Sequence, residues 1–187
     1  MDDHPLFACK RCQAEPLLIP DNACGQTLPV QPGTYALILE LVESMSIEVG
    51  RLGRFDCPSG IYIYLGSARG PGGLGGRLGR HLRRDSKPHW HIDYLVSVSV
   101  VKGVGYIELK VGAAGCCPSE CGWSLTLSAL TGAAIPIPKF GASDCRSGCP
   151  AHLVHFSVFN FWDELPAVLN PSECCSDAKM GLYLLAG

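Results

Sequence analysis

The sequence predicts an α+β domain over residues 33–158, in which a small central sheet of mixed or antiparallel strands is flanked by helices. Residues 34–42 are apolar apart from Thr34 and Glu40, as in a strand buried on both faces. Residues 61–65 carry an aromatic side chain at every second position, which is typical of a second strand. Leucines recur every four residues over 74–82 and so share one face of a helix. Helices against a small sheet are one of the few stable layer arrangements of a domain this size.

The segments around the second strand contain turn signals. Residues 46–49 alternate in polarity, and we expect them to form a hairpin with the strand at 34–42. Residues 51–55, around Gly53, and residues 57–60, which contain Pro, Ser and Gly, are expected to be turns. Residues 66–73 contain four glycines and are predicted to have no regular structure.

A helix is predicted over residues 74–84, with leucines on one side and arginines on the other, and Pro88 closes it. A short helix is expected over residues 89–96. Residues 98–109 are expected to form a strand, or a hairpin broken at Gly103 and Gly105.

Ser119 is the predicted N-cap of a further helix that runs to Leu130. A last short strand is expected over residues 152–158. Residues 1–32 contain five prolines and are interpreted as an extended arm. Residues 159–187 are interpreted as an acidic tail without a clear element before its apolar end.

The charge distribution favours a nucleic-acid partner, although the net charge of the chain is −2. Eight of the 15 Lys and Arg residues lie between Arg51 and Lys87, together with two acidic residues only, Asp56 and Asp85. A local basic surface can bind phosphates on a protein that is nearly neutral overall.

Two tripeptides are arranged as in a known family: Gly33-Thr34-Tyr35 opens the first strand, and Tyr64-Leu65-Gly66 closes the second. With the Arg-bearing helix that follows, the chain resembles the GIY-YIG nuclease superfamily. It looks most like a branch of unassigned function that occurs alone or fused to endonuclease III. The strings that carry this narrower match are Val49-Gly50-Arg51-Leu52-Gly53, Gly70-Pro71-Gly72-Gly73-Leu74, His89-Trp90-His91-Ile92-Asp93-Tyr94 and Phe140-Gly141-Ala142-Ser143-Asp144-Cys145.

The resemblance implies metal-dependent cleavage of phosphodiester bonds. Tyr35 would help to activate water, and the second tripeptide supplies Tyr64. Arg77 would neutralise the charge that builds up on the phosphate, since a guanidinium matches a phosphate bidentately. Glu120 would hold one Mg²⁺ or Mn²⁺ ion, which one carboxylate can do with water and substrate phosphate. His81, at the border of the two faces of its helix, completes the catalytic candidates.

The partner implied is nucleic acid, with DNA favoured over RNA, and the sequence names no protein partner. The candidate phosphate contacts are Arg69, Arg80, Arg83, Arg84 and Lys87. No apolar run reaches the ~20 residues that span a bilayer. The acidic start of the chain lacks the features of a secretory signal, so no membrane role and a cytoplasmic location are expected.

Two other interpretations of the sequence stay open. The first is the same fold without catalysis, as a nucleic-acid-binding or repair-accessory module. The second is a zinc-stabilised protein-interaction domain, because Cys145 and Cys149 have a spacing that zinc sites use. Their candidate co-ligands are His152, His155, Cys116, Cys117 and Cys121. His152 and His155 would face opposite sides of a strand, so both cannot join one site.

Overall fold

The computed structural model describes residues 28–83, 87–109, 119–158, 165–169 and 180–184. Its centre is a six-stranded sheet in the order β6-β7-β4-β1-β5-β8, and every neighbouring pair is antiparallel. The α+β fold class is therefore confirmed. The strands are β1 (Gly33–Leu41), β4 (Gly60–Ala68), β5 (Val100–Glu108), β6 (Ala133–Ala134), β7 (Leu153–Phe156) and β8 (Met180–Leu184).

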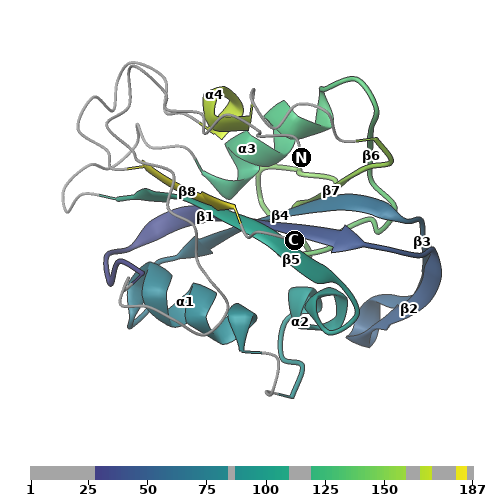
Figure 1. Ribbon diagram of the computed structural model, residues 1–187, viewed down its shortest axis with the longest axis horizontal. Helices are drawn as coiled ribbons and strands as arrows, with labels where there is room; N and C mark the ends of the chain where they lie inside the picture. Colours follow the sequence, from purple (N-terminus) through teal and green to yellow (C-terminus); the bar gives the residue numbers. More distant parts are fainter. Residues whose placement is uncertain (1–27, 84–86, 110–118, 159–164, 170–179, 185–187) are drawn as a thin grey trace, which may run out of the picture.

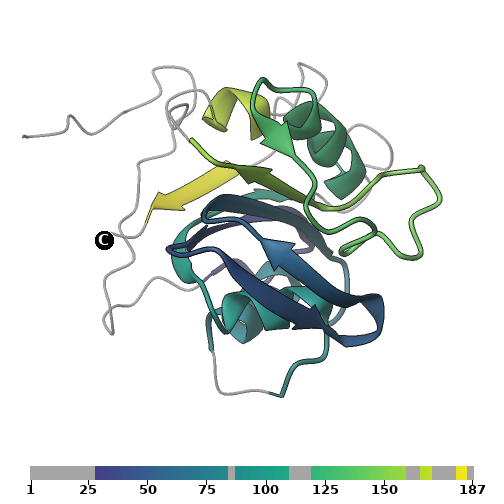
Figure 2. The same cartoon turned by 90° about the vertical axis from the view of Figure 1, so that its right-hand side faces the viewer.

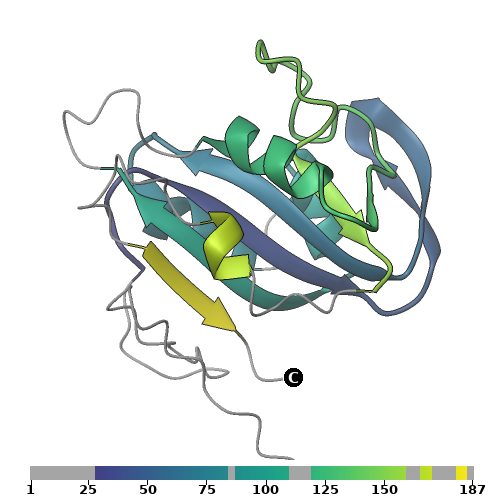
Figure 3. The same cartoon turned by 90° about the horizontal axis from the view of Figure 1, so that it is seen from above.

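Helices cover both faces of the sheet (Figure 1). Helices α1 (Gly73–Leu82) and α2 (His91–Val96) lie on one face, and α3 (Glu120–Ser128) and α4 (Leu165–Leu169) lie on the other. Figure 3 shows α3 and α4 above the strands. Among the described residues, no helix is long and apolar enough to cross a membrane.

The apolar run in β1 is explained by this three-layer arrangement. Its alternate side chains enter two different cores: Leu37 and Leu39 pack toward α1 and α2, while Ala36 and Ile38 pack toward α3 and α4. All four are fully buried. A central strand with helices on both sides needs apolar residues at consecutive positions, which is the pattern seen in the sequence.

The expected hairpin between residues 46–49 and the first strand is wrong. Residues Met45–Val49 (β2) pair instead with β3 (Gly53–Cys57), which was expected to be a turn. This two-stranded ribbon projects beside the main sheet (Figure 2). Its connection is a short 3-10 turn, Gly50–Leu52. The apolar side chains of Ile47 and Val49 join the core formed with α1 and α2, so tertiary packing determines the partner of β2.

Other boundaries differ by a few residues or by a whole element. Strand β4 continues through residues 66–68, expected to be irregular, because β1 pairs with it over nine residues. Strand β5 is continuous across both of its glycines. Ser119 caps α3 as predicted, since its Oγ accepts a hydrogen bond from the backbone N–H of Gly122. The C-terminal segment contributes α4 and the edge strand β8, neither of which was predicted.

Candidate active site

The two tripeptide tyrosines lie side by side on neighbouring strands, as predicted. Tyr35 on β1 is paired with Gly66 on β4, and the ring centroids of Tyr35 and Tyr64 are 6.2 Å apart. A Cβ atom on residue 66 would lie 2.5 Å from the Tyr35 ring. The glycine of the second tripeptide therefore makes room for the tyrosine of the first.

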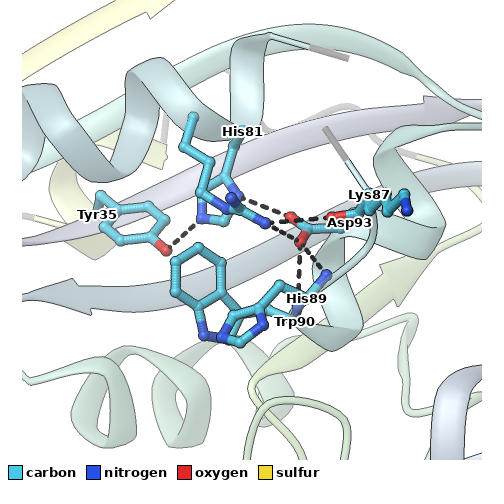
Figure 4. Close-up of polar contacts among 7 residues, drawn as sticks. Tyr35, His81, Lys87, His89, Trp90 and Asp93 are labelled. Atoms are coloured by element: carbon cyan, nitrogen blue, oxygen red, sulfur yellow. Dashed lines mark hydrogen bonds and ion pairs between the residues drawn. The ribbon is translucent and has the colours of Figure 1, made fainter. Parts of the chain in front are cut away.

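The Tyr35 hydroxyl leads into a buried polar network (Figure 4). Its Oη lies 2.9 Å from His81 Nε2, and His81 Nδ1 lies 3.3 Å from Asp93 Oδ1. The other carboxylate oxygen, Asp93 Oδ2, accepts hydrogen bonds from the backbone N–H groups of His89 and Trp90, at 2.8 and 3.0 Å. Arg80 Nη2 lies 3.2 Å from the same oxygen. Asp93 therefore caps α2 and also contacts the side chains of Arg80 and His81 on α1.

The ionisation of this network follows from burial and hydrogen bonding. Burial lowers the pKa of His81 to about 4, although the carboxylate of Asp93 opposes the shift. Burial works against ionisation of Asp93, but the backbone N–H groups of Trp90 and His89, together with Arg80, hold its pKa below the usual value. At neutral pH a neutral imidazole thus faces a carboxylate. We assign the His81 proton to Nδ1, facing Asp93, which leaves Nε2 to accept a hydrogen bond from the Tyr35 hydroxyl.

Both tyrosines are neutral phenols at neutral pH. Burial, reinforced by the neighbouring Tyr64, raises the pKa of Tyr35 well above its ordinary value. Burial raises the pKa of Tyr64 to about 12, against the lowering effect of the Arg77 charge. The two hydroxyl groups are close enough to affect each other's ionisation. Tyr35 is 2% exposed, whereas Tyr64 is half-buried, so Tyr64 is the one of the pair that solvent reaches.

Arg77 and Arg80 both lie against the Trp90 ring, with their Cζ atoms 4.1 and 4.6 Å from its centroid. Stacking on an aromatic face fixes a guanidinium plane while its N–H groups stay free to bind an anion. Arg77 is half-buried, and its charge acts on both tyrosines. Arg80 is committed to Asp93, which makes it part of the internal network.

The remaining predicted phosphate contacts are distributed around α1. Arg69, Arg83 and Lys87 are exposed. Arg84 lies outside the described residues.

Glu120 is the first residue of α3 and approaches β4 from the face opposite to Tyr64. Its Oε1 accepts a hydrogen bond of 3.1 Å from Ser67 Oγ. Its Oε2 is buried and has no hydrogen-bond partner among the described residues. A buried carboxylate oxygen without a partner is costly, and a bound cation would satisfy it. The charge of Glu120 also acts on Tyr64, so the two groups share one electrostatic environment.

The glycines that begin α1 serve backbone packing. The N–H groups of Leu74 and Gly75 donate to the carbonyl oxygens of Gln31 and Pro29, at 2.9 and 2.8 Å. A Cβ atom on Gly73 would lie 2.1 Å from the carbonyl oxygen of Val30. The first turn of α1 is thus closed by the preceding chain, and a phosphate has to be bound by side chains.

The cysteine cluster lies beside this site. Cys145 and Cys149 meet Cys121 of α3 and His152, and the four ligand atoms all lie within 4.8 Å of one another. His155 faces elsewhere, with its Nε2 3.0 Å from the carbonyl oxygen of Ser59. Cys116 and Cys117 lie outside the described residues.

Residues 34–171 match the family model described as "Domain of unknown function DUF123". The chain belongs to the DUF123 family. No curated protein and no solved structure matches this DUF123 chain significantly.

Two residues of the DUF123 site were not singled out by their own chemistry in the sequence. Asp93 is the third residue of α2, where an acidic side chain commonly caps the helix by accepting backbone N–H bonds. The sequence position of Asp93 could have predicted that it caps the helix. It could not have predicted that Asp93 contacts His81. Ser67 follows the second tripeptide, and only the position of α3 shows that it contacts Glu120.

The stability of the DUF123 domain is expected to fall in acid through His81. Its pKa is 6.5 when unperturbed and about 4 in the folded chain, so between these values the unfolded state binds more protons. The contribution is complete above about pH 6.5 and is lost as the pH falls toward 4. At about 1.4 kcal/mol per pKa unit, it amounts to about 3 kcal/mol. Urea unfolding at pH 4.5 and pH 7.5 measures it.

The variant His81→Gln isolates this contribution, because the other histidines remain. Its free energy of unfolding should depend less on pH than that of the wild type. His89→Gln, at an exposed position, is the matched control and should keep the wild-type slope. Equal slopes in wild type and His81→Gln would contradict a buried neutral imidazole.

Proposed function

We propose that this DUF123 domain is a GIY-YIG-like nuclease that hydrolyses phosphodiester bonds in DNA with Mg²⁺ or Mn²⁺. The observation that carries the proposal is the Tyr35–Tyr64 pair beside the stacked guanidinium of Arg77, together with Glu120, whose charge acts on Tyr64 and whose Oε2 has no hydrogen-bond partner among the described residues. These groups are the ones that charge neutralisation, water activation and metal binding require. The exposed side chains of Arg69, Arg83 and Lys87 support binding of a polyanion.

In this proposal Glu120 and Arg77 have different roles. Glu120 Oε2 is the atom that would hold the divalent cation. When bound, the cation supplies Lewis-acid stabilisation of the phosphate charge. Arg77, fixed on Trp90, donates its N–H groups to the non-bridging phosphate oxygens, whose charge grows in the transition state.

Water is activated through a chain of hydroxyl groups. Tyr64, the more exposed tyrosine, accepts a proton from the attacking water and passes its own proton to Tyr35. Tyr35 passes its proton to His81 Nε2, and the carboxylate of Asp93 stabilises the resulting imidazolium. Each phenol loses one proton and gains one, so neither has to form a phenolate. As the water oxygen bonds to phosphorus, the P–O bond to the leaving sugar oxygen breaks; that oxygen takes a proton from solvent, and the His81 imidazolium returns its proton to solvent. Their raised pKa values are then no obstacle to the reaction.

The proposal is tested with labelled branched, single-stranded and duplex DNA in the presence of Mg²⁺, Mn²⁺ or a chelator. Cleavage should require the metal, and Glu120→Gln should lower the rate by about 10²- to 10³-fold, since it removes the charge that holds the ion. Glu48→Gln is the matched control, because Glu48 makes only an exposed ion pair of 3.5 Å with Arg54.

Two results would contradict the proposal. Equal rates in the wild type and Glu120→Gln would assign the cleavage to another site or protein. Tight, salt-sensitive DNA binding without cleavage of any substrate would favour the non-catalytic binding module.

A further inference from the structure

A set of three cysteines and one histidine gathers where α3 begins. Cys121 belongs to the first turn of α3, Cys145 and Cys149 belong to the connection between β6 and β7, and His152 directly precedes β7. Residues widely separated in the sequence thus bring four metal-ligating atoms together. The nuclease chemistry proposed above does not use these side chains.

The distances fit a tetrahedral zinc ion. With Zn–S bonds of about 2.3 Å and Zn–N bonds of about 2.0–2.1 Å, a tetrahedron has S···S edges of about 3.8 Å and S···N edges of about 3.5 Å. Cys121 Sγ lies 3.5 Å from Cys145 Sγ and 3.5 Å from His152 Nε2. The remaining pairs lie within 4.8 Å, so small side-chain movements complete the geometry.

The same distances speak against a disulfide. Bonded sulfurs lie about 2.05 Å apart, well below the 3.5 Å between Cys121 and Cys145. Cys145, Cys149 and Cys121 are all free thiols in this structure. A Cys₃His set is a recurrent ligand set for structural zinc.

The loop that contains Cys145 and Cys149 would be stabilised by a bound ion. Residues 135–152, all described, connect β6 to β7 without a helix or strand. Long ordered connections of this kind need anchoring to keep one conformation. Two backbone bonds, from Lys139 to Pro150 and from His152 to Phe140, close the loop on itself at 2.7 Å each. An ion bound by this loop and by Cys121 would tie it to α3.

We propose that Cys121, Cys145, Cys149 and His152 bind one structural Zn²⁺ ion, which fastens the loop 135–152 to the first turn of α3. All four coordination positions are filled by protein atoms, as in a structural site and unlike a catalytic one. The inference does not rest on the proposed nuclease activity, and Glu120→Gln should leave the zinc in place.

The chain of 187 residues, purified without chelator, should contain about one zinc per chain by mass spectrometry of the metal. X-ray absorption at the zinc edge should show about three sulfur neighbours at about 2.3 Å and one nitrogen at about 2.0–2.1 Å. Cobalt exchanged into the same protein should show the visible bands of a tetrahedral thiolate site. These measurements on the wild type stand even if a ligand variant does not fold.

Single variants assign the ligands. Cys145→Ser and Cys121→Ser should each lose the zinc, whereas Cys57→Ser, at a buried free cysteine outside the cluster, should retain it. The triple variant Cys9→Ser, Cys12→Ser, Cys24→Ser, which removes the three cysteines of residues 1–27, should also retain it. Metal-free wild type that does not take up zinc, an oxygen-rich shell, or loss of the metal in the triple variant alone would overturn the proposal.

Discussion

Asp93→Asn is expected to lower the rate of DNA cleavage by about 10³- to 10⁴-fold while the domain stays folded. An asparagine can still accept the backbone N–H bonds that cap α2, but it cannot stabilise an imidazolium. Its amide can also turn its NH₂ group toward His81 and favour the wrong tautomer, as happens when the orienting acid of a catalytic triad is replaced by its amide. Single-turnover cleavage with saturating protein measures the chemical step directly.

Arg80→Gln is the matched control for this experiment. It removes the ion pair of 3.2 Å with Asp93 but leaves the carboxylate facing His81, so the rate should fall far less. The pH profile separates positioning from packing: the wild-type rate should decline as the pH falls toward about 4, where half of the His81 imidazole is protonated. A similar loss in both variants would mean that Asp93 acts only through packing.

Arg77→Ala is expected to lower the single-turnover rate by about 10²- to 10³-fold and to weaken DNA binding only modestly. The guanidinium is stacked on Trp90 at 4.1 Å, so its position is prepared before the substrate binds. A prepared charge of this kind acts mainly on the transition state. The dissociation constant for uncleaved DNA, measured without metal, should change much less than the rate.

Arg83→Ala should show the opposite behaviour. Arg83 is exposed at the end of α1, so it should contribute to binding and to its salt dependence but not to the chemical step. If Arg77→Ala and Arg83→Ala lose rate and affinity in the same proportion, both arginines serve binding alone.

Local patterns were enough to predict the elements that carry the tyrosines and Arg77. Strand β1 is a continuous apolar run, β4 and α1 each have a strong period, and the tripeptides locate Tyr35 near the start of β1 and Tyr64 in the middle of β4. The strand that pairs with β2 could not be predicted from local patterns. The alternation in β2 shows one apolar face but does not say which strand lies opposite, and packing against α2 decided it.

The contacts between distant segments were the harder part of the site. Asp93 meets His81 because α2 packs beside α1, and Cys121 meets Cys145 because α3 lies over β4 and β7. Sequence spacing correctly separated His152 from His155, since alternation along a strand is a local property. Sequence spacing left three candidate cysteine co-ligands for Cys145 and Cys149. Of these, Cys121 lies in the described part of the chain and belongs to the cluster.

The folded domain begins before the first residue of the family match, because the carbonyl oxygens of Pro29 and Gln31 accept hydrogen bonds from the first turn of α1. That match begins at residue 34, yet the helix that carries Arg77 and His81 is completed by residues 29–31. Pro32 adds a further tie, because its carbonyl oxygen accepts a 2.7 Å hydrogen bond from the N–H of Leu109 at the end of β5. The folded domain therefore includes the segment from Pro29 onward. A version trimmed to the family boundary would leave the first turn of α1 uncapped and two strands loosened at the end that holds the tyrosines.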